Sequence, residues 1–279
     1  MISRVRIWIQ ILFTALTNSY TSGIYKTSIY RGKLKNLCVP GLSCYSCPGA
    51  LGSCPIGGLQ SVIGDRKFDL SFYMMGFFLI VGGLLGRFVC GWLCPFGLVQ
   101  DLIYKIPFAK KLNNFSLDKY LKWLKYIILV VFVIVLPMVI TNFVGMGLPW
   151  FCKYICPAGT LTAGIPMVLR HSHFADAAGF LFKWKLLILI LLLVISVIVY
   201  RPFCRYICPL GVIYGFFNPI ALFRFKVDKS KCIGCNKCES TCKFNIKVYE
   251  NPNSFQCIRC NSCRDTCPTK AIIMNEIAK

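Results

Sequence analysis

Long apolar segments alternate with short polar ones along the first 225 residues. Residues 70–86, 126–145 and 186–200 contain no charged side chain. Each segment approaches or reaches the length that crosses a bilayer, and Pro137 predicts a kink in the second. Residues 5–25 form a fourth candidate, and because no small-residue cleavage site follows their apolar part, we expect an uncleaved helix rather than a signal peptide. The pattern predicts an α-helical polytopic membrane protein with about four transmembrane helices and both chain ends on one side.

The apolar character ends after Phe225. Residues 227–277 are mixed in polarity and too few to build much of a core without bound metal. We therefore expect two domains, a transmembrane domain of residues 1–225 and a soluble α+β domain of residues 226–279. The composition agrees, since 56% hydrophobic residues and a mean hydropathy of +0.63 exceed the values of ordinary soluble domains.

The formal net charge of +22 favours an anionic membrane surface or an acidic partner. Nucleic acid is not expected, because Lys and Arg flank the apolar segments instead of forming one stripe. On the side of the membrane where both termini are expected, the cations near the spans are Arg4, Arg6, Lys110, Lys111, Lys119, Lys122 and Lys125. On the opposite side they are Arg31, Lys33, Lys35, Arg66 and Lys67. This small excess predicts that both termini lie in the cytoplasm of a bacterial or archaeal cell, with the protein in its inner membrane.

Eight of the eighteen cysteines form two runs of Cys-x2-Cys-x2-Cys-x3-Cys near the C-terminus. In two-cluster ferredoxins with this spacing, the fourth cysteine of each run binds the cluster of the other run. The prediction is one [4Fe–4S] cluster on Cys232, Cys235, Cys238 and Cys267, and a second on Cys257, Cys260, Cys263 and Cys242. The match to bacterial two-cluster ferredoxins is close, although Lys243 stands where proline is usual. A zinc ribbon would have fewer cysteines in each run.

Three copies of Cys-x3-Cys-Pro-x-Gly follow the apolar segments. They comprise Cys90, Cys94 and Gly97; Cys152, Cys156 and Gly159; and Cys204, Cys208 and Gly211, with a degenerate copy at Cys54-Pro-Ile-Gly57. Proline suits the first position of a helix, whose N–H groups favour an anionic cluster, and glycine admits a bulky group. Helix–turn signals alone would explain the proline and glycine but not the paired cysteines. We expect the short segments after the motifs to form re-entrant or interfacial helices.

Each motif supplies two ligands, so motifs must pair to hold a cluster. Four spans place Cys90, Cys94, Cys204 and Cys208 on the side of the C-terminal domain. Arg87 and Arg201 stand three residues before the first cysteine of these two motifs, either to offset cluster charge or as interfacial cations. The opposite side receives Cys152 and Cys156 together with Cys38, Cys44, Cys47 and Cys54. These six could hold one cluster with two spare thiols, or a cluster plus another metal or a disulfide.

The combination of four helices, Cys-x3-Cys-Pro-x-Gly motifs and a terminal two-cluster ferredoxin resembles the membrane iron–sulfur proteins of the periplasmic nitrate reductase system. These are described as quinol dehydrogenase membrane components, and similar modules occur in nitrous-oxide reductase accessory proteins and cytochrome oxidase assembly proteins. The resemblance implies electron transfer between a membrane or cytoplasmic donor and a redox partner across the membrane. Members typically have two membrane motifs; the three motifs here, plus the N-terminal cysteines, favour a longer series of clusters.

We therefore expect an electron-transfer subunit with two clusters in the ferredoxin domain and one or two in the membrane domain. Its partners would be other subunits of a membrane redox complex, a redox protein on the side opposite the ferredoxin, and lipid. Since one electron hop across about 30 Å of hydrocarbon would be slow, the motifs must lie inside the bilayer or a partner must bridge the gap. No nucleotide loop, flavin motif or hydrolytic constellation is present, so no catalytic residue of its own is expected.

Two other functions remain open. A quinol dehydrogenase component would bind a quinone, with His171 or His173 as a proton acceptor, although loop histidines are more often simply exposed. An iron–sulfur assembly or metal-handling factor for a respiratory enzyme would need a surface to hold its client, and no additional soluble domain is evident for that purpose.

Overall fold

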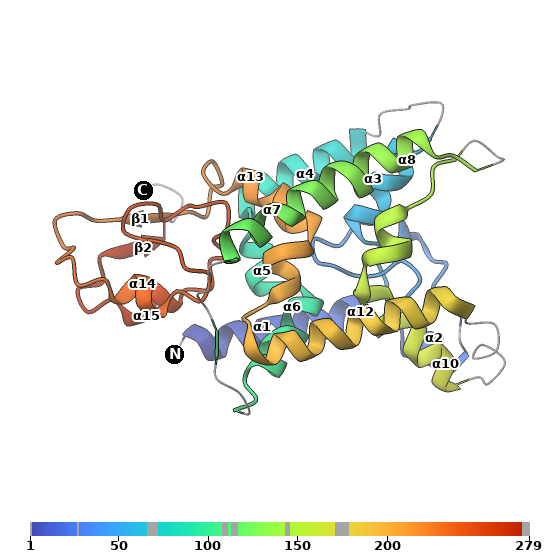
Figure 1. Ribbon diagram of the computed structural model, residues 1–279, viewed down its shortest axis with the longest axis horizontal. Coiled ribbons are helices and arrows are strands. Elements are labelled where there is room, and N and C mark those ends of the chain that lie inside the picture. Colours follow the sequence, from blue (N-terminus) through green and yellow to red (C-terminus); the bar gives the residue numbers. More distant parts are fainter. Residues whose placement is uncertain are drawn as a thin grey trace.

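The protein has a helical region and a smaller C-terminal unit at one end of it (Figure 1). The computed structural model describes residues 2–26, 28–65, 72–107, 111–112, 117–142, 146–170 and 179–274. The N-terminal helix α1 (Ile2–Thr17) begins beside the C-terminal unit and contacts its helix α15 (Ser262–Thr266). The beginning of the described chain and its C-terminal unit therefore lie at the same end of the molecule.

Two helices are long and apolar enough to cross a membrane. One runs over Asp118–Val139 and comprises α7 (Asp118–Ile128), the π-helix η2 (Leu129–Val135) and α8 (Leu136–Val139). The other is α12 (Gly179–Ile198). The remaining two expected spans form shorter apolar helices, Val5–Thr17 within α1 and α4 (Phe72–Leu85). Both long helices begin seven or eight residues earlier than the apolar runs, and these added turns contain charged side chains with partners in the protein, Asp118 with Arg205 and Lys185 with the Cys152 carbonyl.

Near Pro137, where the sequence predicts a kink, the helix contains a π-helical stretch. The π-helix η2 ends two residues before Pro137, which stands in the first turn of α8. Proline has no N–H to donate to the preceding turn, and a π-helical stretch is a common local adjustment of the hydrogen-bond ladder.

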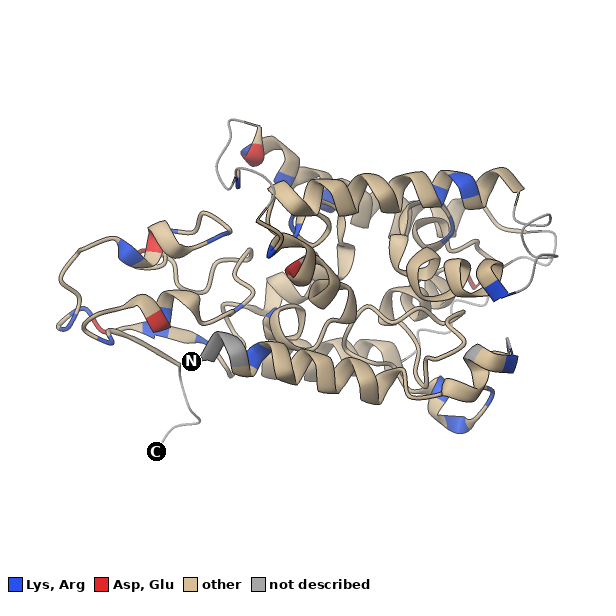
Figure 2. Cartoon of the chain, turned by 90° about the horizontal axis from the view of Figure 1, so that it is seen from below, with Lys and Arg blue, Asp and Glu red and all other residues tan. Residues whose placement is uncertain are grey.

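The outward faces of these helices carry large apolar side chains. Trp8, Phe72, Trp123 and Leu187 are 58–81% exposed, and only 17% of the most apolar window of α12 is buried. Charged side chains are sparse along the middle of the long helices (Figure 2). An apolar surface of this extent suits lipid or an apolar partner better than water.

Shorter helices fill the space between the long ones. They are α3 (Pro55–Ile63), α5 (Phe88–Trp92), α6 (Pro95–Tyr104), η3 (Phe151–Ile155), α9 (Pro157–Gly159), η4 (Thr160–Gly164), α10 (Ile165–Arg170), η5 (Phe203–Ile207) and α13 (Pro209–Phe217). α2 (Thr21–Lys26) and η1 (Lys33–Asn36) lie in the N-terminal loop. Helices α3, α6, α9 and α13 each begin at the proline of a Cys-Pro pair, with the cysteine as an extended N-cap. The role expected for these prolines is therefore confirmed.

The two halves of the C-terminal unit follow the same backbone path. Strand β1 (Phe225–Val227) pairs antiparallel with β2 (Ile272–Met274), and α14 (Lys237–Thr241) packs on α15. Positive φ angles recur at positions 25 residues apart: Gly234 and Arg259, Asn236 and Asn261, Asn245 and Lys270. Because the two cysteine runs are also 25 residues apart, each cysteine has an equivalent in the other half.

Candidate metal centres

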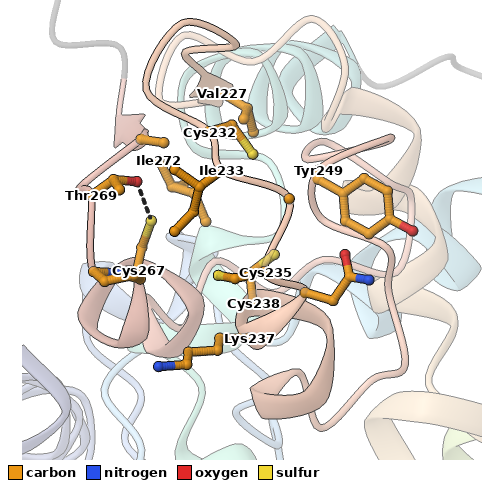
Figure 3. A pocket seen from close by; sticks show the side chains of 14 residues that line it. Val227, Cys232, Ile233, Cys235, Lys237, Cys238, Tyr249, Cys267, Thr269 and Ile272 are labelled. Atoms are coloured by element: carbon orange, nitrogen blue, oxygen red, sulfur yellow. Dashed lines mark hydrogen bonds between the residues drawn. The ribbon is translucent and has the colours of Figure 1, made fainter.

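The first group of thiols lies at the outer part of the C-terminal unit. Cys232, Cys235, Cys238 and Cys267 line one cavity of about 120 Å³ (Figure 3). We call these four the first ferredoxin group. Three come from one run and the fourth from the other run, which is the crossed set that the spacing predicts. Cys232 and Cys235 are exposed, so this group faces the surroundings of the protein.

Hydrogen bonds at Cys267 favour a thiolate there. Partial burial opposes ionisation, but the Thr269 hydroxyl and the backbone N–H groups of Ala271, Thr269 and Ile272 outweigh it and lower the pKa of the Cys267 thiol. Because iron binds the thiolate, these donors prepare Cys267 as a ligand.

The second ferredoxin group comprises Cys242, Cys257, Cys260 and Cys263. Cys263 lies within electrostatic range of the other three. Burial raises the pKa of Cys257 to about 12 and also raises that of Cys242. Burial thus favours the protonated form of Cys257 and Cys242, so metal binding at these two thiols would release protons.

A third group lies in the helical region and is formed by Cys90, Cys94, Cys204 and Cys208. We call these four buried thiols the near group. Cys208 lies within electrostatic range of the other three. Backbone N–H groups of Gly97 and Gly211, in the first turns of α6 and α13, point at the sulfurs of Cys94 and Cys208. Helix N-termini thus face the space between the thiols, where they would stabilise an anionic cluster.

The arginine that precedes each motif of the near group hydrogen-bonds to the backbone of the other motif. Arg87, before Cys90, donates a hydrogen bond of 3.2 Å to the carbonyl of Cys204. Arg201, before Cys204, donates one of 2.5 Å to the carbonyl of Cys90. Both side chains are completely buried, which rules out the interfacial-cation alternative.

The motif glycines make room for these arginines. A Cβ atom at Gly97 would stand 3.1 Å from Arg201 Nη1, and one at Gly211 would stand 3.0 Å from Arg87 Nη2. The bulky neighbour expected at these glycines is therefore a guanidinium group. The arginine of each motif and the glycine of the other form a reciprocal pair.

Sequence analysis missed two further side chains at the near group. Gln100 donates to the sulfur of Cys204 at 3.3 Å and accepts from the Phe203 N–H at 3.1 Å. Asp101 binds Arg201 through two hydrogen bonds of 2.7 and 2.5 Å and pairs with Arg6 at 2.9 Å. Asp101 is buried, so its charge depends on these arginines.

The second ferredoxin group is joined to the near group through Asn218. The Asn218 amide accepts from the Arg87 N–H at 2.9 Å and donates to the carbonyls of Ser254 and Cys257 at 2.9 and 2.8 Å. Arg259 adds hydrogen bonds to the carbonyls of Leu85 and Asn218 at 2.9 and 2.7 Å. These contacts fix the C-terminal unit against the near group.

Two residues that looked like surface or turn positions also lie at this junction. Lys125, counted among the cations flanking the spans, is buried and donates to Gln256 Oε1 at 2.5 Å. Lys243, at the usual proline position, offers its carbonyl to Arg205 at 2.9 Å, and Arg205 pairs with Asp118 at 2.6 Å. Local patterns could not reveal these contacts because they join distant segments.

Four of the remaining six thiols meet at the other end of the helical region. Cys44, Cys54, Cys152 and Cys156, which we call the far group, line a cavity of about 410 Å³. Cys38 contacts the Met74 sulfur at 3.7 Å, and Cys47 contacts the Thr162 carbonyl at 3.3 Å. All eighteen cysteines have free thiols. Gly159 lies beside Cys44, while His171 and His173 lie outside the described residues.

The described thiols do not form a compact site for a single metal ion. Among the described residues, no group of three or more His, Cys, Asp or Glu side chains converges as a mononuclear metal site requires. The four cysteines around a cubane bind four different iron atoms, so their sulfurs stand farther apart than those around one zinc ion. The first ferredoxin group and the far group each line one cavity, and buried arginines and helix N-termini surround the near group. Such sets of four thiols are the donors that [4Fe–4S] clusters require.

Comparison with known sequences agrees with this donor set. The profile of a 4Fe–4S binding domain matches residues 70–114, 126–172 and 184–230, each containing one membrane motif, and a second 4Fe–4S binding profile matches residues 225–247. The chain belongs to the ferredoxin-type 4Fe–4S proteins. The three membrane matches show that the repeat found in the sequence is the repeat of this family.

Relatives of this ferredoxin-type chain include electron-transport proteins. An uncharacterized protein of Methanocaldococcus jannaschii is 33% identical over 60% of this chain and 63% of its own length. The putative electron transport protein YccM of Escherichia coli is 24% identical over 72% and 56%, and the ferredoxin-type protein NapH of Haemophilus influenzae is 28% identical over 60% and 50%. The chain thus matches between half and two thirds of the length of each of these three relatives. No solved structure matches it.

Proposed function

We propose that this chain is an electron-transfer subunit of a membrane redox complex. It would hold two [4Fe–4S] clusters in its ferredoxin groups, one in the near group and one in the far group. The observation that carries the proposal is the side-chain continuity between these groups. Asn218 touches both Cys257 and Arg87, and Tyr214 lies within electrostatic range of Cys90 and Cys54.

The protein supplies each site with thiolates, counter-charge and exclusion of water. When bound, the clusters would supply one-electron redox chemistry. The completely buried Arg87 and Arg201 would offset the negative charge of a cluster in the near group. The exposed first ferredoxin group suits exchange with a soluble or membrane-associated donor, and the far group suits exchange at the opposite end.

We propose a multi-pass membrane location with the C-terminal unit in the cytoplasm. The two long apolar helices and the exposed apolar faces of α1 and α4 support this arrangement. Other subunits of the complex would cover part of this apolar surface, and a redox partner protein would dock at the far end. Labelling of single cysteines introduced at exposed positions, from either side of sealed vesicles, tests the orientation.

Iron and sulfide analysis with EPR spectroscopy tests the electron-transfer function. We expect at least three [4Fe–4S] centres, all reducible through the C-terminal unit. The Cys90→Ser protein should lose the near centre and stop flux to the far end while keeping the ferredoxin signals. Detection of two or fewer iron–sulfur centres in the wild-type protein would refute the proposal.

A second candidate function, quinol oxidation, is favoured by the cavity at the far group. Its volume is more than three times that of the first ferredoxin cavity, and Lys35, Asn36, Tyr45 and Ser61 contribute to its lining. This leaves space for a small ligand beside a cluster. Reduction of the isolated protein by a quinol analogue would support this function, and lack of any reduction would favour the electron-transfer subunit alone.

A further inference from the structure

The far group repeats the surroundings of the near group. Gln60 follows Cys54 by six residues, as Gln100 follows Cys94. Gln60 donates to the sulfur of Cys152 at 3.2 Å and accepts from the Phe151 N–H at 3.0 Å. Gln100 makes the same two contacts with Cys204 and Phe203. Cys54, Cys152 and Cys156 therefore correspond to Cys94, Cys204 and Cys208 of the near group.

Cations that bind motif carbonyls repeat as well, although their residue type and position in the chain differ. Lys185 of α12 donates to the Cys152 carbonyl at 3.1 Å, as Arg87 donates to the Cys204 carbonyl. Lys35 donates to the Ala50 carbonyl at 2.9 Å, as Arg201 donates to the Cys90 carbonyl. Each motif thus has one cation on the carbonyl of its first residue.

This correspondence exposes one missing thiol. Ala50 stands four residues before Cys54, where the near group has Cys90 four residues before Cys94. The segment around Ala50 contains bends instead of the short helix α5. A cluster in the far group therefore needs its fourth ligand from another part of the chain.

Cys44 meets the requirements for that ligand. Its thiol lines the cavity together with Cys54, Cys152 and Cys156 and lies within electrostatic range of Cys152 and Cys156. A Cβ atom at Gly159 would stand 3.0 Å from the Cys44 sulfur, so the motif glycine leaves space for it. Cys38 and Cys47 do not line this cavity, and their sulfurs contact Met74 and Thr162 instead.

We propose that the far group is a [4Fe–4S] site with the ligands Cys44, Cys54, Cys152 and Cys156, in which the loop residue Cys44 replaces the ligand missing at Ala50. Cys38 and Cys47 are structural thiols. The type of cluster assigned here rests on the proposed electron-transfer function. The choice of its ligands rests on the contacts that the far group shares with the near group.

Single substitutions in the full-length protein test this ligand set. Cys44→Ala should remove the far centre or convert it to a three-iron form, seen as a loss of about one to four irons per chain and a changed EPR spectrum. Cys47→Ala and Cys38→Ala are matched controls and should keep the wild-type iron content and spectrum. Unchanged iron and EPR in Cys44→Ala, or the same loss in Cys47→Ala, would overturn the assignment.

Thiol labelling of the wild-type protein gives an answer that does not depend on how the variants fold. In cluster-loaded protein, Cys44 should resist alkylation, and it should become reactive once oxidation and chelation remove the clusters. Alkylation of Cys44 in fully loaded protein would overturn the ligand set. That result would leave electron transfer through the other groups intact, whereas absence of the near and ferredoxin centres would refute the proposed function itself.

Discussion

The Tyr214 hydroxyl donates a hydrogen bond of 3.1 Å to the carbonyl oxygen of Pro40. Tyr214 is completely buried in α13 and lies within electrostatic range of Cys90 and Cys94 on one side and of Cys38 and Cys54 on the other. One side chain thus borders two cysteine regions that sequence topology assigns to opposite sides of a membrane. This favours motifs placed inside the bilayer over a partner that bridges it.

The Tyr214→Phe protein should be less stable and should transfer electrons more slowly between the near and far groups. The substitution removes the hydrogen bond to the partly buried Pro40 carbonyl, which costs about 0.5–1.5 kcal/mol. Thermal inactivation in detergent and rapid-mixing EPR measure the two effects. Tyr120→Phe, at an exposed position of α7, is the matched control, and equal behaviour of the two variants would contradict the prediction.

The Arg201→Lys protein should lose stability and near-group iron although it keeps the positive charge. A single ammonium group cannot reach both Asp101 oxygens and the Cys90 carbonyl together. Lost hydrogen bonds to a charged partner cost about 1.5–3 kcal/mol each. Iron content and thermal inactivation measure the effect, and Arg224→Lys, at an exposed site, should remain like wild type.

Asn218→Ala should weaken the junction between the C-terminal unit and the near group. Three partners, of which the Arg87 N–H is buried, lose their hydrogen bonds, so we expect a loss on the order of 3 kcal/mol and slower transfer from the ferredoxin clusters to the near cluster. Asn253→Ala is the matched control because Asn253 bonds to the N–H and the carbonyl of Phe225, within the C-terminal unit. If Asn253→Ala slowed transfer equally, the junction would have no special role.

Arg259→Gly and Arg259→Ala should separate backbone strain from side-chain anchoring. Arg259 has φ of +52° at the position where the first half of the unit has Gly234. Both variants lose the anchoring hydrogen bonds. In the left-handed conformation at this position, alanine bears a steric cost of about 1–2 kcal/mol, whereas glycine, which has no Cβ atom, does not. Arg259→Gly should therefore be more stable than Arg259→Ala by about that amount, in the free energy of unfolding of the loaded protein. Equal stability would contradict the strain argument.

Motif spacing predicted the parts of this protein that depend on local chemistry. It predicted the prolines that begin α3, α6, α9 and α13 and the crossed cysteine sets of the C-terminal unit. The order of the spans predicted the near group, but of the six cysteines expected on the far side only four share a cavity. Gln60 and Gln100 could have been found in the same way, since both follow a Cys-Pro pair at equal distance. Lys35, Lys185 and Asn218 could not, because they reach the sites from unrelated segments and only the packed chain brings them there.

The crossed arginines of the near group have a consequence for biogenesis. Arg87 and Cys90 are synthesised more than a hundred residues before Cys204, yet neither arginine has its carbonyl partner until both motifs are present. The early half would wait with buried polar groups unsatisfied until the last long helix has been inserted. Under the proposed membrane arrangement, a cluster in the near group could be completed only after that helix is in place.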